Sequence, residues 1–162
     1  MTTADTIALA ANVRIDYFDA SGRHLDSAET HNATTQDWHG HILADIHAAE
    51  SVDESITHLA FGDGDSEPGV SDDVLDNEVA RFLLTSSDRD GPTLVLSAAL
   101  TTADANGESL LELGLVTDED PGESMLVNRA LVPDPEGRLD PKTQDVQATV
   151  TVTLSAADVS EL

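Results

Sequence analysis

The chain has 162 residues, enough for one domain with a substantial core. Its 32 Asp and Glu residues face only seven Lys and Arg residues, which gives a formal net charge of -25. This balance argues against binding to nucleic acid or to an anionic membrane surface, because both need clustered basic side chains. Patterned runs of Leu, Val, Ile and Ala argue against disorder. The charge indicates a folded protein adapted to molar salt, where acidic self-repulsion is screened within about 3 Å.

The chain contains no cysteine, which excludes disulfide bonds and thiolate metal sites. Its first residues lack the basic start of a secretory signal. No stretch reaches the roughly 18 apolar residues that a membrane-spanning helix needs. We therefore expect a soluble protein.

The first elements are predicted from alternating side chains. Residues 1–11 are expected to form an arm or a short first strand. Residues 12–19 alternate between apolar and more polar positions, which is typical of a strand. Ala20-Ser21-Gly22 has the composition of a hairpin turn, and residues 23–30 are polar enough to be a returning edge strand.

Residues 34–49 have the apolar spacing of an amphipathic helix, and Thr34 or Thr35 can cap its N-terminus. Histidines lie on this helix, but His39 and His41 are only two residues apart and point in nearly opposite directions. Two histidines that bind one metal from a helix need a spacing of three or four residues. We therefore predict no metal site here.

The stretch from residue 56 to residue 81 is predicted to place a surface loop between two buried strands. Residues 56–61 form the first strand, and Gly62 and Gly64 pace the turn that follows, where left-handed dihedrals are expected. The Gly-Asp-Gly-Asp turn has part of the pattern of a calcium loop, but the acidic series breaks after Asp65. A turn is therefore predicted instead of a cation site. The second strand starts near Glu78.

Further strands are predicted at residues 80–87, 92–102, 110–116, 125–132 and 145–154. Asn106-Gly107 is a hairpin signal. Residues 133–141 carry three prolines and form a long loop, and residues 156–162 form a short acidic tail.

These elements predict a mainly β fold, an antiparallel β-sandwich-like domain with one α-helix over about residues 34–49. The chain divides into an N-terminal arm and hairpin (residues 1–33), a β-rich domain (residues 34–155) and the acidic tail. There is no nucleophile elbow, phosphate-binding loop or dinucleotide fingerprint. With 32 carboxylates, pairs of acids arise by chance. We therefore predict no catalytic residue and no cofactor.

Glu112 is the one carboxylate that stands apart, because it lies within the apolar run Leu110 to Val116. One alternative places it in solvent on an exposed face. The other buries it, and a buried carboxylate needs a hydrogen-bonded cation to offset its desolvation. Arg81 and Arg129 each end an apolar run. Our hypothesis is that one of these two arginines pairs with Glu112 and fixes its strand.

The order of short motifs over residues 34–155 carries a resemblance. A Gly-x-Gly turn is followed by a proline loop and by Leu-x-x-Glu-x-x-Arg, and later come Asn-Gly, Glu-x-Gly-Leu, a strand that ends in Arg, and Lys-Thr before a long final strand. The residues are Gly62, Gly64, Leu75, Glu78, Arg81, Asn106, Gly107, Glu112, Gly114, Arg129, Lys142 and Thr143. This order resembles the tail-fibre, collar and baseplate-type structural proteins of tailed viruses.

The resemblance implies a virion component that assembles with itself and with other tail proteins and catalyses no reaction. Abundant acid and a single lysine resemble proteins of extremely halophilic archaea, so the implied source is a haloarchaeal tailed virus. Two alternatives stay open. One is a turret or decoration protein on the capsid of the same virion. The other is a non-viral halophilic enzyme or binding domain with a sandwich fold.

Overall fold

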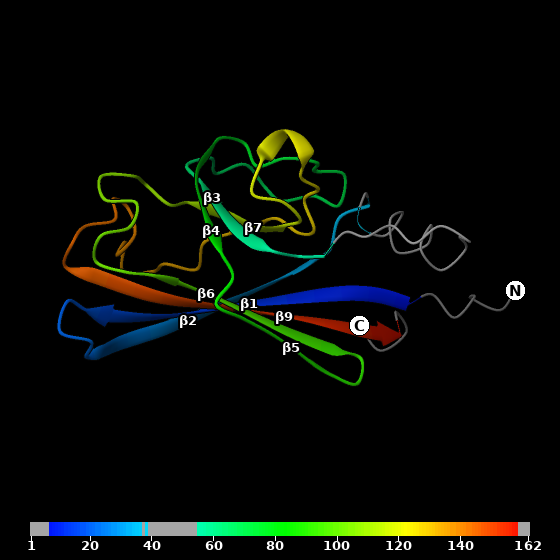
Figure 1. Cartoon of the computed structure of the whole chain (residues 1–162), viewed down its shortest axis with the longest axis horizontal. Helices are drawn as coiled ribbons and strands as arrows, with labels where there is room; N and C mark the ends of the chain where they lie inside the picture. The colour runs from blue at the N-terminus through cyan, green and yellow to red at the C-terminus, as the bar shows by residue number, and fades with distance from the viewer. Residues whose placement is uncertain (1–6, 37, 39–54, 159–162) are drawn as a thin grey trace, which may run out of the picture.

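The computed structural model describes residues 7–36, 38 and 55–158. In this part the chain is mainly β, with two antiparallel sheets that lie face to face (Figure 1). The helical element that lies wholly within the described residues is a single 3-10 turn, Pro121–Glu123. The expected β-rich class is therefore confirmed at this level.

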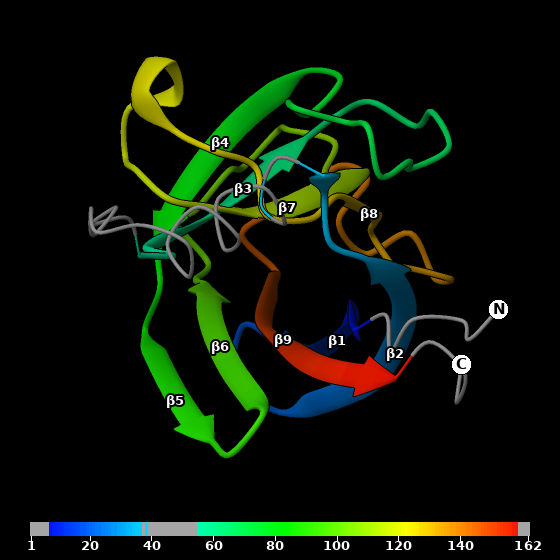
Figure 2. The same cartoon turned by 90° about the vertical axis from the view of Figure 1, so that its right-hand side faces the viewer.

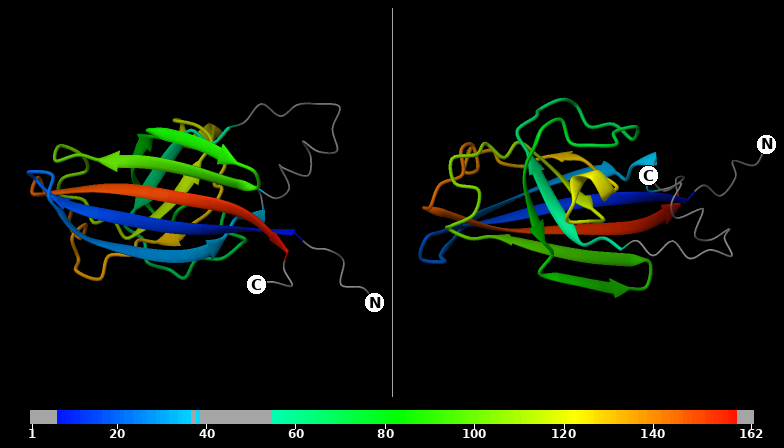
Figure 3. Two further views of the ribbon diagram at one scale, coloured as in Figure 1. Left: turned by 90° about the horizontal axis from the view of Figure 1, so that it is seen from below. Right: turned by 45° about the horizontal axis from the view of Figure 1, so that its top comes forward.

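The larger sheet has five strands in the order β2-β1-β9-β6-β5. Their bounds are β1 Ile7–Asp19, β2 His24–Ala33, β5 Ser86–Asp90, β6 Thr93–Leu100 and β9 Val146–Asp158. The two longest strands, β1 and β9, pair along their whole length at the middle of this sheet (Figure 3). The N-terminal hairpin of β1 and β2 thus joins the larger sheet through its pairing with β9, the last strand.

The smaller sheet has four strands in the order β4-β3-β7-β8. Their bounds are β3 His58–Gly62, β4 Glu78–Leu83, β7 Glu112–Val116 and β8 Ala130–Leu131. Figure 2 shows this sheet packed across the concave side of the larger one. Every strand pair in both sheets is antiparallel.

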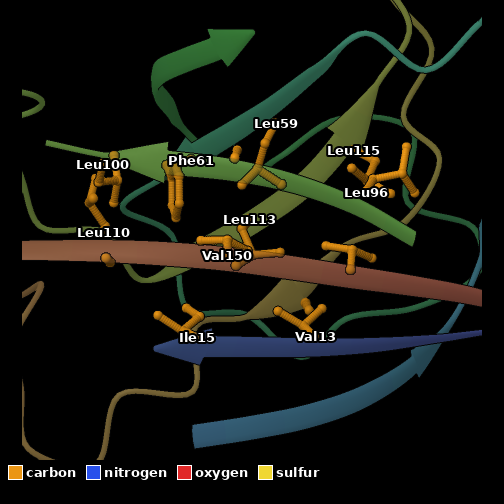
Figure 4. Packing of buried hydrophobic residues seen from close by; sticks show 14 of the residues in the cluster. Val13, Ile15, Leu59, Phe61, Leu96, Leu100, Leu110, Leu113, Leu115 and Val150 are labelled. Atoms are coloured by element: carbon orange, nitrogen blue, oxygen red, sulfur yellow. The ribbon is translucent and has the colours of Figure 1, made fainter. Parts of the chain in front are cut away.

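The hydrophobic core fills the space between the two sheets (Figure 4). Val13 and Ile15 of β1 point into it from the larger sheet, and Phe61 and Leu113 point into it from the smaller one. The alternation that predicted the first and last strands is the cause, because every second side chain of a strand faces one side. Tyr17 is also buried, and its hydroxyl donates a hydrogen bond to the carbonyl of Pro133.

The predicted helix over residues 34–49 is not confirmed. Thr34 forms an isolated β-bridge with Asn128, and its side chain is buried. Strand pairing therefore extends to Thr34, one of the two residues that we expected to cap the helix, whereas Oγ1 of the other, Thr35, accepts a hydrogen bond from the amide of Trp38 at 3.2 Å. Residues 37 and 39–54, which include the histidines, lie outside the described residues.

Four strand predictions need correction. The strand expected at residues 80–87 is split, because the chain leaves the smaller sheet after Leu83 and enters the larger one at Ser86. Residues 125–132 form only isolated bridges and the two-residue β8. Strand β1 starts at Ile7, within the residues expected to form an arm or a short first strand, and joins them to the strand expected from residue 12, while β9 continues to Asp158, within the expected tail.

Asn106-Gly107 does not close a hairpin. It lies in the turns that connect β6 of the larger sheet to β7 of the smaller one. Gly107 takes a φ of 89° there, and its amide donates to the carbonyl of Lys142. Gly107 therefore supplies a left-handed residue in these turns, but Asn106 does not take the positive φ that an Asn-Gly hairpin turn requires.

The face of the smaller sheet that points away from the core is covered by residues 63–77 and 117–125, here called the outer layer (Figure 1). Leu75 of this layer packs with Ala60, Val116 and Leu126 in a small second cluster of buried side chains. Among the described residues, no helix has the length and apolar character to cross a membrane.

Candidate functional site

Glu112 begins β7 on the side of the smaller sheet that faces the outer layer. Its strand neighbour Leu113 points into the core, so Glu112 points the opposite way. In the pairing of β3 with β7, Gly62 lies opposite Glu112 and Ala60 lies opposite Gly114. Small residues therefore surround the carboxylate on this face, and they leave room for the outer layer to approach closely.

The carboxylate of Glu112 is fully buried and accepts four hydrogen bonds. Its Oε2 atom accepts from the backbone amides of Gly64, at 2.8 Å, and Asn77, at 3.0 Å. Its Oε1 atom accepts from the amide of Asp76 and from Nε of Arg129, both at 2.8 Å. One side chain thus holds both ends of the loop over residues 63–77 and the segment that leads into β8.

Arg129 is 2% exposed and contacts three carboxylates at once. Besides Glu112, its Nη2 atom lies 3.1 Å from Asp76 and its Nη1 atom lies 3.3 Å from Asp72. Burial lowers the pKa of this guanidinium, but the hydrogen bond and charge of Glu112, together with the charge of Asp76 and the hydrogen bond to Asp72, outweigh burial, so the pKa is raised. We call Glu112, Arg129, Asp72 and Asp76 the acid–arginine lock.

Arg81, the other arginine considered for Glu112, lies elsewhere. It forms a two-pronged ion pair with Glu78 of the same strand, at 2.6 Å and 3.0 Å, and also donates to the carbonyl of Asp118. Arg81 and Glu78 therefore join β4 to the outer layer without entering the lock.

Gly62 and Gly64 are required for a reason that differs from the one expected. Neither has a positive φ, so left-handed dihedrals are not their role. A Cβ atom on Gly62 would lie 2.5 Å from Oε2 of Glu112, and one on Gly64 would lie at the same distance and also overlap the side chain of Asp76. Both glycines are therefore needed because the backbone lies directly against the buried carboxylate.

Gly114, two residues after Glu112 in β7, is also a position where neighbouring atoms leave no room for a side chain. A Cβ atom there would overlap the carbonyl oxygen of Asn128 and lie 2.6 Å from Leu126. Asn128 is itself buried, and its Oδ1 atom accepts from the amide of Leu115 at 3.0 Å. The Glu-x-Gly motif thus supplies the carboxylate and the space beside it.

We expect Gly64→Ala to lower the free energy of unfolding by about 1–3 kcal/mol, because the added methyl group forces the loop away from Glu112. Gly69→Ala is the matched control. It lies in the same loop, it has no positive φ, and its Cβ would meet nothing within 4 Å. Denaturant unfolding in molar salt measures both. Equal effects of the two substitutions would contradict the close-approach role of Gly64.

Lys142, the single lysine of the chain, forms a second buried polar contact that we did not predict. Its side chain is fully buried, and Nζ donates to the Asn106 side chain, at 3.1 Å, and to the carbonyl of Thr143, at 2.8 Å. Burial lowers the pKa of this amine, and the nearby charge of Asp104 opposes the shift in part. The signal in the sequence that could have indicated this contact is that Lys142 is the one lysine of a strongly acidic chain.

The sequence also gave no reason to select Asp72 and Asp76 from among the many acids of this loop. Hydrogen bonds from the Ser66 side chain and amide, together with the charge of Arg129, lower the pKa of Asp76. In the described residues, no group of three or more His, Asp or Glu side chains is arranged to hold a metal ion. The charged groups of the lock instead satisfy one another.

Comparison with known proteins adds no relative. No family model, no curated protein and no solved structure matches the chain.

Proposed function

We propose that the chain is a structural protein of a virion, and that it acts in the tail, baseplate or tail-fibre attachment of a haloarchaeal tailed virus. Its work is assembly with copies of itself and with other tail proteins, and it catalyses no reaction. The support is the order of motifs along the chain and the mainly β fold.

The observation that carries the proposal is the convergence of separate motifs on one buried network. The Gly-x-Gly turn, the acidic loop, the Glu-x-Gly strand and the arginine that precedes β8 meet at the carboxylate of Glu112. These four hydrogen bonds fill the accepting capacity of the carboxylate. This network fixes the loop over residues 63–77 on the outside of the smaller sheet. It therefore sets the shape of a protein surface, and an assembly protein binds its neighbours through such surfaces.

The experiment that tests the proposal is mass spectrometry of purified virus particles, separated into tail and head fractions. We expect the chain in the tail fraction, in a fixed ratio to the other tail proteins. Its presence in heads would replace the tail assignment with that of a decoration protein. Its absence from particles made by cells that express it would overturn the proposal.

The halophilic part of the proposal predicts a salt-dependent fold. A net charge of -25 repels itself strongly in dilute buffer, where the Debye length is about 10 Å at 0.1 M salt, and weakly in molar salt. We expect a clearly higher melting temperature in about 3 M KCl than in about 0.1 M KCl. Equal melting temperatures in the two solutions would argue against adaptation to high salt.

A further inference from the structure

The turns that connect β6 to β7 contain the one Asn-Gly dipeptide of the chain, Asn106-Gly107. An asparagine before glycine is especially prone to deamidation, because glycine has no side chain to hinder the approach of its own amide nitrogen to the asparagine. Every other asparagine precedes a residue with a side chain, namely Asn12, Asn32, Asn77 and Asn128. Asn106 is exposed in the fold, so water reaches it. The connection between the two sheets therefore carries a reactive site that the proposed function does not use.

Deamidation requires two groups of this dipeptide to meet. Hydroxide removes the proton of the Gly107 amide, and the nitrogen attacks Cγ of Asn106, which forms a carbon–nitrogen bond and closes a succinimide ring. The bond between Cγ and Nδ2 breaks, and Nδ2 leaves as ammonia after it takes a proton from solvent. Water then opens the ring at one of its carbonyls and leaves either aspartate or isoaspartate. Water and hydroxide are the co-reactants that this sequence of steps needs.

Lys142 holds both reacting groups in the folded chain. Its carbonyl accepts a hydrogen bond from the amide of Gly107 at 2.8 Å, and its Nζ atom donates to Oδ1 of Asn106 at 3.1 Å. The leaving group is also held, because Nδ2 of Asn106 donates to the carbonyl of Thr102 at 2.9 Å. Lys142 is itself fully buried, and its amide donates to the carbonyl of Glu108 at 2.8 Å. The turn is therefore fixed against this lysine from both sides.

These contacts oppose each step that comes before ring closure. A hydrogen-bonded amide loses its proton only when its bond opens, which is also the condition for hydrogen exchange. Rotation of the Asn106 side chain toward Gly107 breaks the hydrogen bonds to Lys142 and Thr102 as well. We propose that Asn106-Gly107 is a deamidation site that the folded chain keeps closed, and that Lys142 is the residue that closes it. The inference does not depend on the proposed function.

Peptide mapping by mass spectrometry tests the site with the wild-type chain alone. One sample is folded in about 3 M KCl, where acidic repulsion is screened, and the other is unfolded in guanidinium chloride at the same mildly alkaline pH. We expect aspartate and isoaspartate to form at Asn106 at least about tenfold more slowly in the folded sample, because the reaction waits for a local opening. Asn77 is the internal control. It is exposed but precedes Glu78, so it should react slowly in both samples.

Hydrogen exchange and Lys142→Met test the part played by the lysine. In the wild-type chain, folding should slow deamidation at Asn106 by a larger factor than it slows exchange of the Gly107 amide, because the side-chain hydrogen bonds must break in addition. Lys142→Met removes one of these bonds and should raise the deamidation rate by a larger factor than the exchange rate. Arg89→Met, which removes an exposed positive charge elsewhere, should keep the wild-type rates. Circular dichroism in the same salt shows whether each variant is folded.

Equal deamidation rates in the folded and unfolded samples overturn the inference, and so does an unfolded chain in which Asn106 reacts no faster than Asn77. A folded Lys142→Met chain in which exchange and deamidation rise by the same factor overturns the role of the lysine amine, because a loosened turn alone would have that effect. The comparison of folded and unfolded wild-type chain decides whether the site is closed even where Lys142→Met does not fold.

Discussion

Glu112→Gln is expected to lower the free energy of unfolding by about 3–5 kcal/mol, as removal of one partner of a buried ion pair does. The glutamine can still accept hydrogen bonds at one atom, but its amide nitrogen cannot accept from Gly64 and Asn77, as Oε2 does. Two backbone amides then lose their partner, and Arg129 keeps its charge without the carboxylate on Nε. Denaturant unfolding in molar salt measures the loss.

Glu78→Gln is the control, because it alters the other glutamate that faces an arginine in this sheet. The side chains of Arg81 and Glu78 are 11% and 26% exposed, so this pair is partly buried, and its loss should lie between the about 0–1 kcal/mol of an exposed pair and the about 3–5 kcal/mol of a fully buried one. A loss of only a few tenths of a kcal/mol for Glu112→Gln, or equal losses for the two substitutions, would contradict a stabilising role of the lock.

Lys142 is expected to make the fold more stable as the pH rises. Burial lowers the pKa of its amine in the folded chain below the ordinary value of 10.5. Between these two values the unfolded chain binds more protons than the folded one, so a rise in pH favours folding. The gain starts as the pH passes the folded pKa and is complete above the unfolded pKa.

Melting of the wild-type chain and Lys142→Met from about pH 8 to about pH 10.5, the ordinary pKa of the amine, isolates this effect, because the difference between the two chains cancels groups that they share. Tyr17 is one of these shared groups, and its pKa is raised by burial. Arg89→Met removes an exposed positive charge instead of a buried one, and it should keep the wild-type slope. A Lys142→Met chain with that same slope would contradict the assignment.

Side-chain alternation was enough to predict the strands that bury one face. Val13 and Ile15 predicted β1, and the alternation of residues 145–154 predicted β9, because every second side chain of a strand faces the core. Alternation does not say which strands pair. The chain crosses between sheets after Leu83, and nothing local separates that crossing from a continuous strand.

The site was predictable to the extent that an isolated charge in an apolar run demands a partner. This reasoning selected Glu112 and two arginines, and the smaller sheet decides between the arginines. Arg129 directly precedes β8, which pairs with β7, and so reaches Glu112, whereas Arg81 is bound to Glu78. It could not select Asp72 and Asp76, since their places depend on how a loop folds back over Gly64. The glycines were identified, but their reason was found only in the contacts.

The lock also bears on how the chain rejects wrong partners for β7 while it folds. Gly62 and Glu112 face each other only in the native alignment of β3 with β7. A slip by one residue turns the carboxylate into the core, and a slip by two places it against Ala60 or beyond the end of β3, away from its amide donors. A slip that turns the carboxylate into the core buries its charge without compensation, which is strongly unfavourable, and the other slips forfeit its hydrogen bonds. Apolar strands of similar composition mispair easily, and a single glutamate whose partners are spread along the chain makes such errors short-lived.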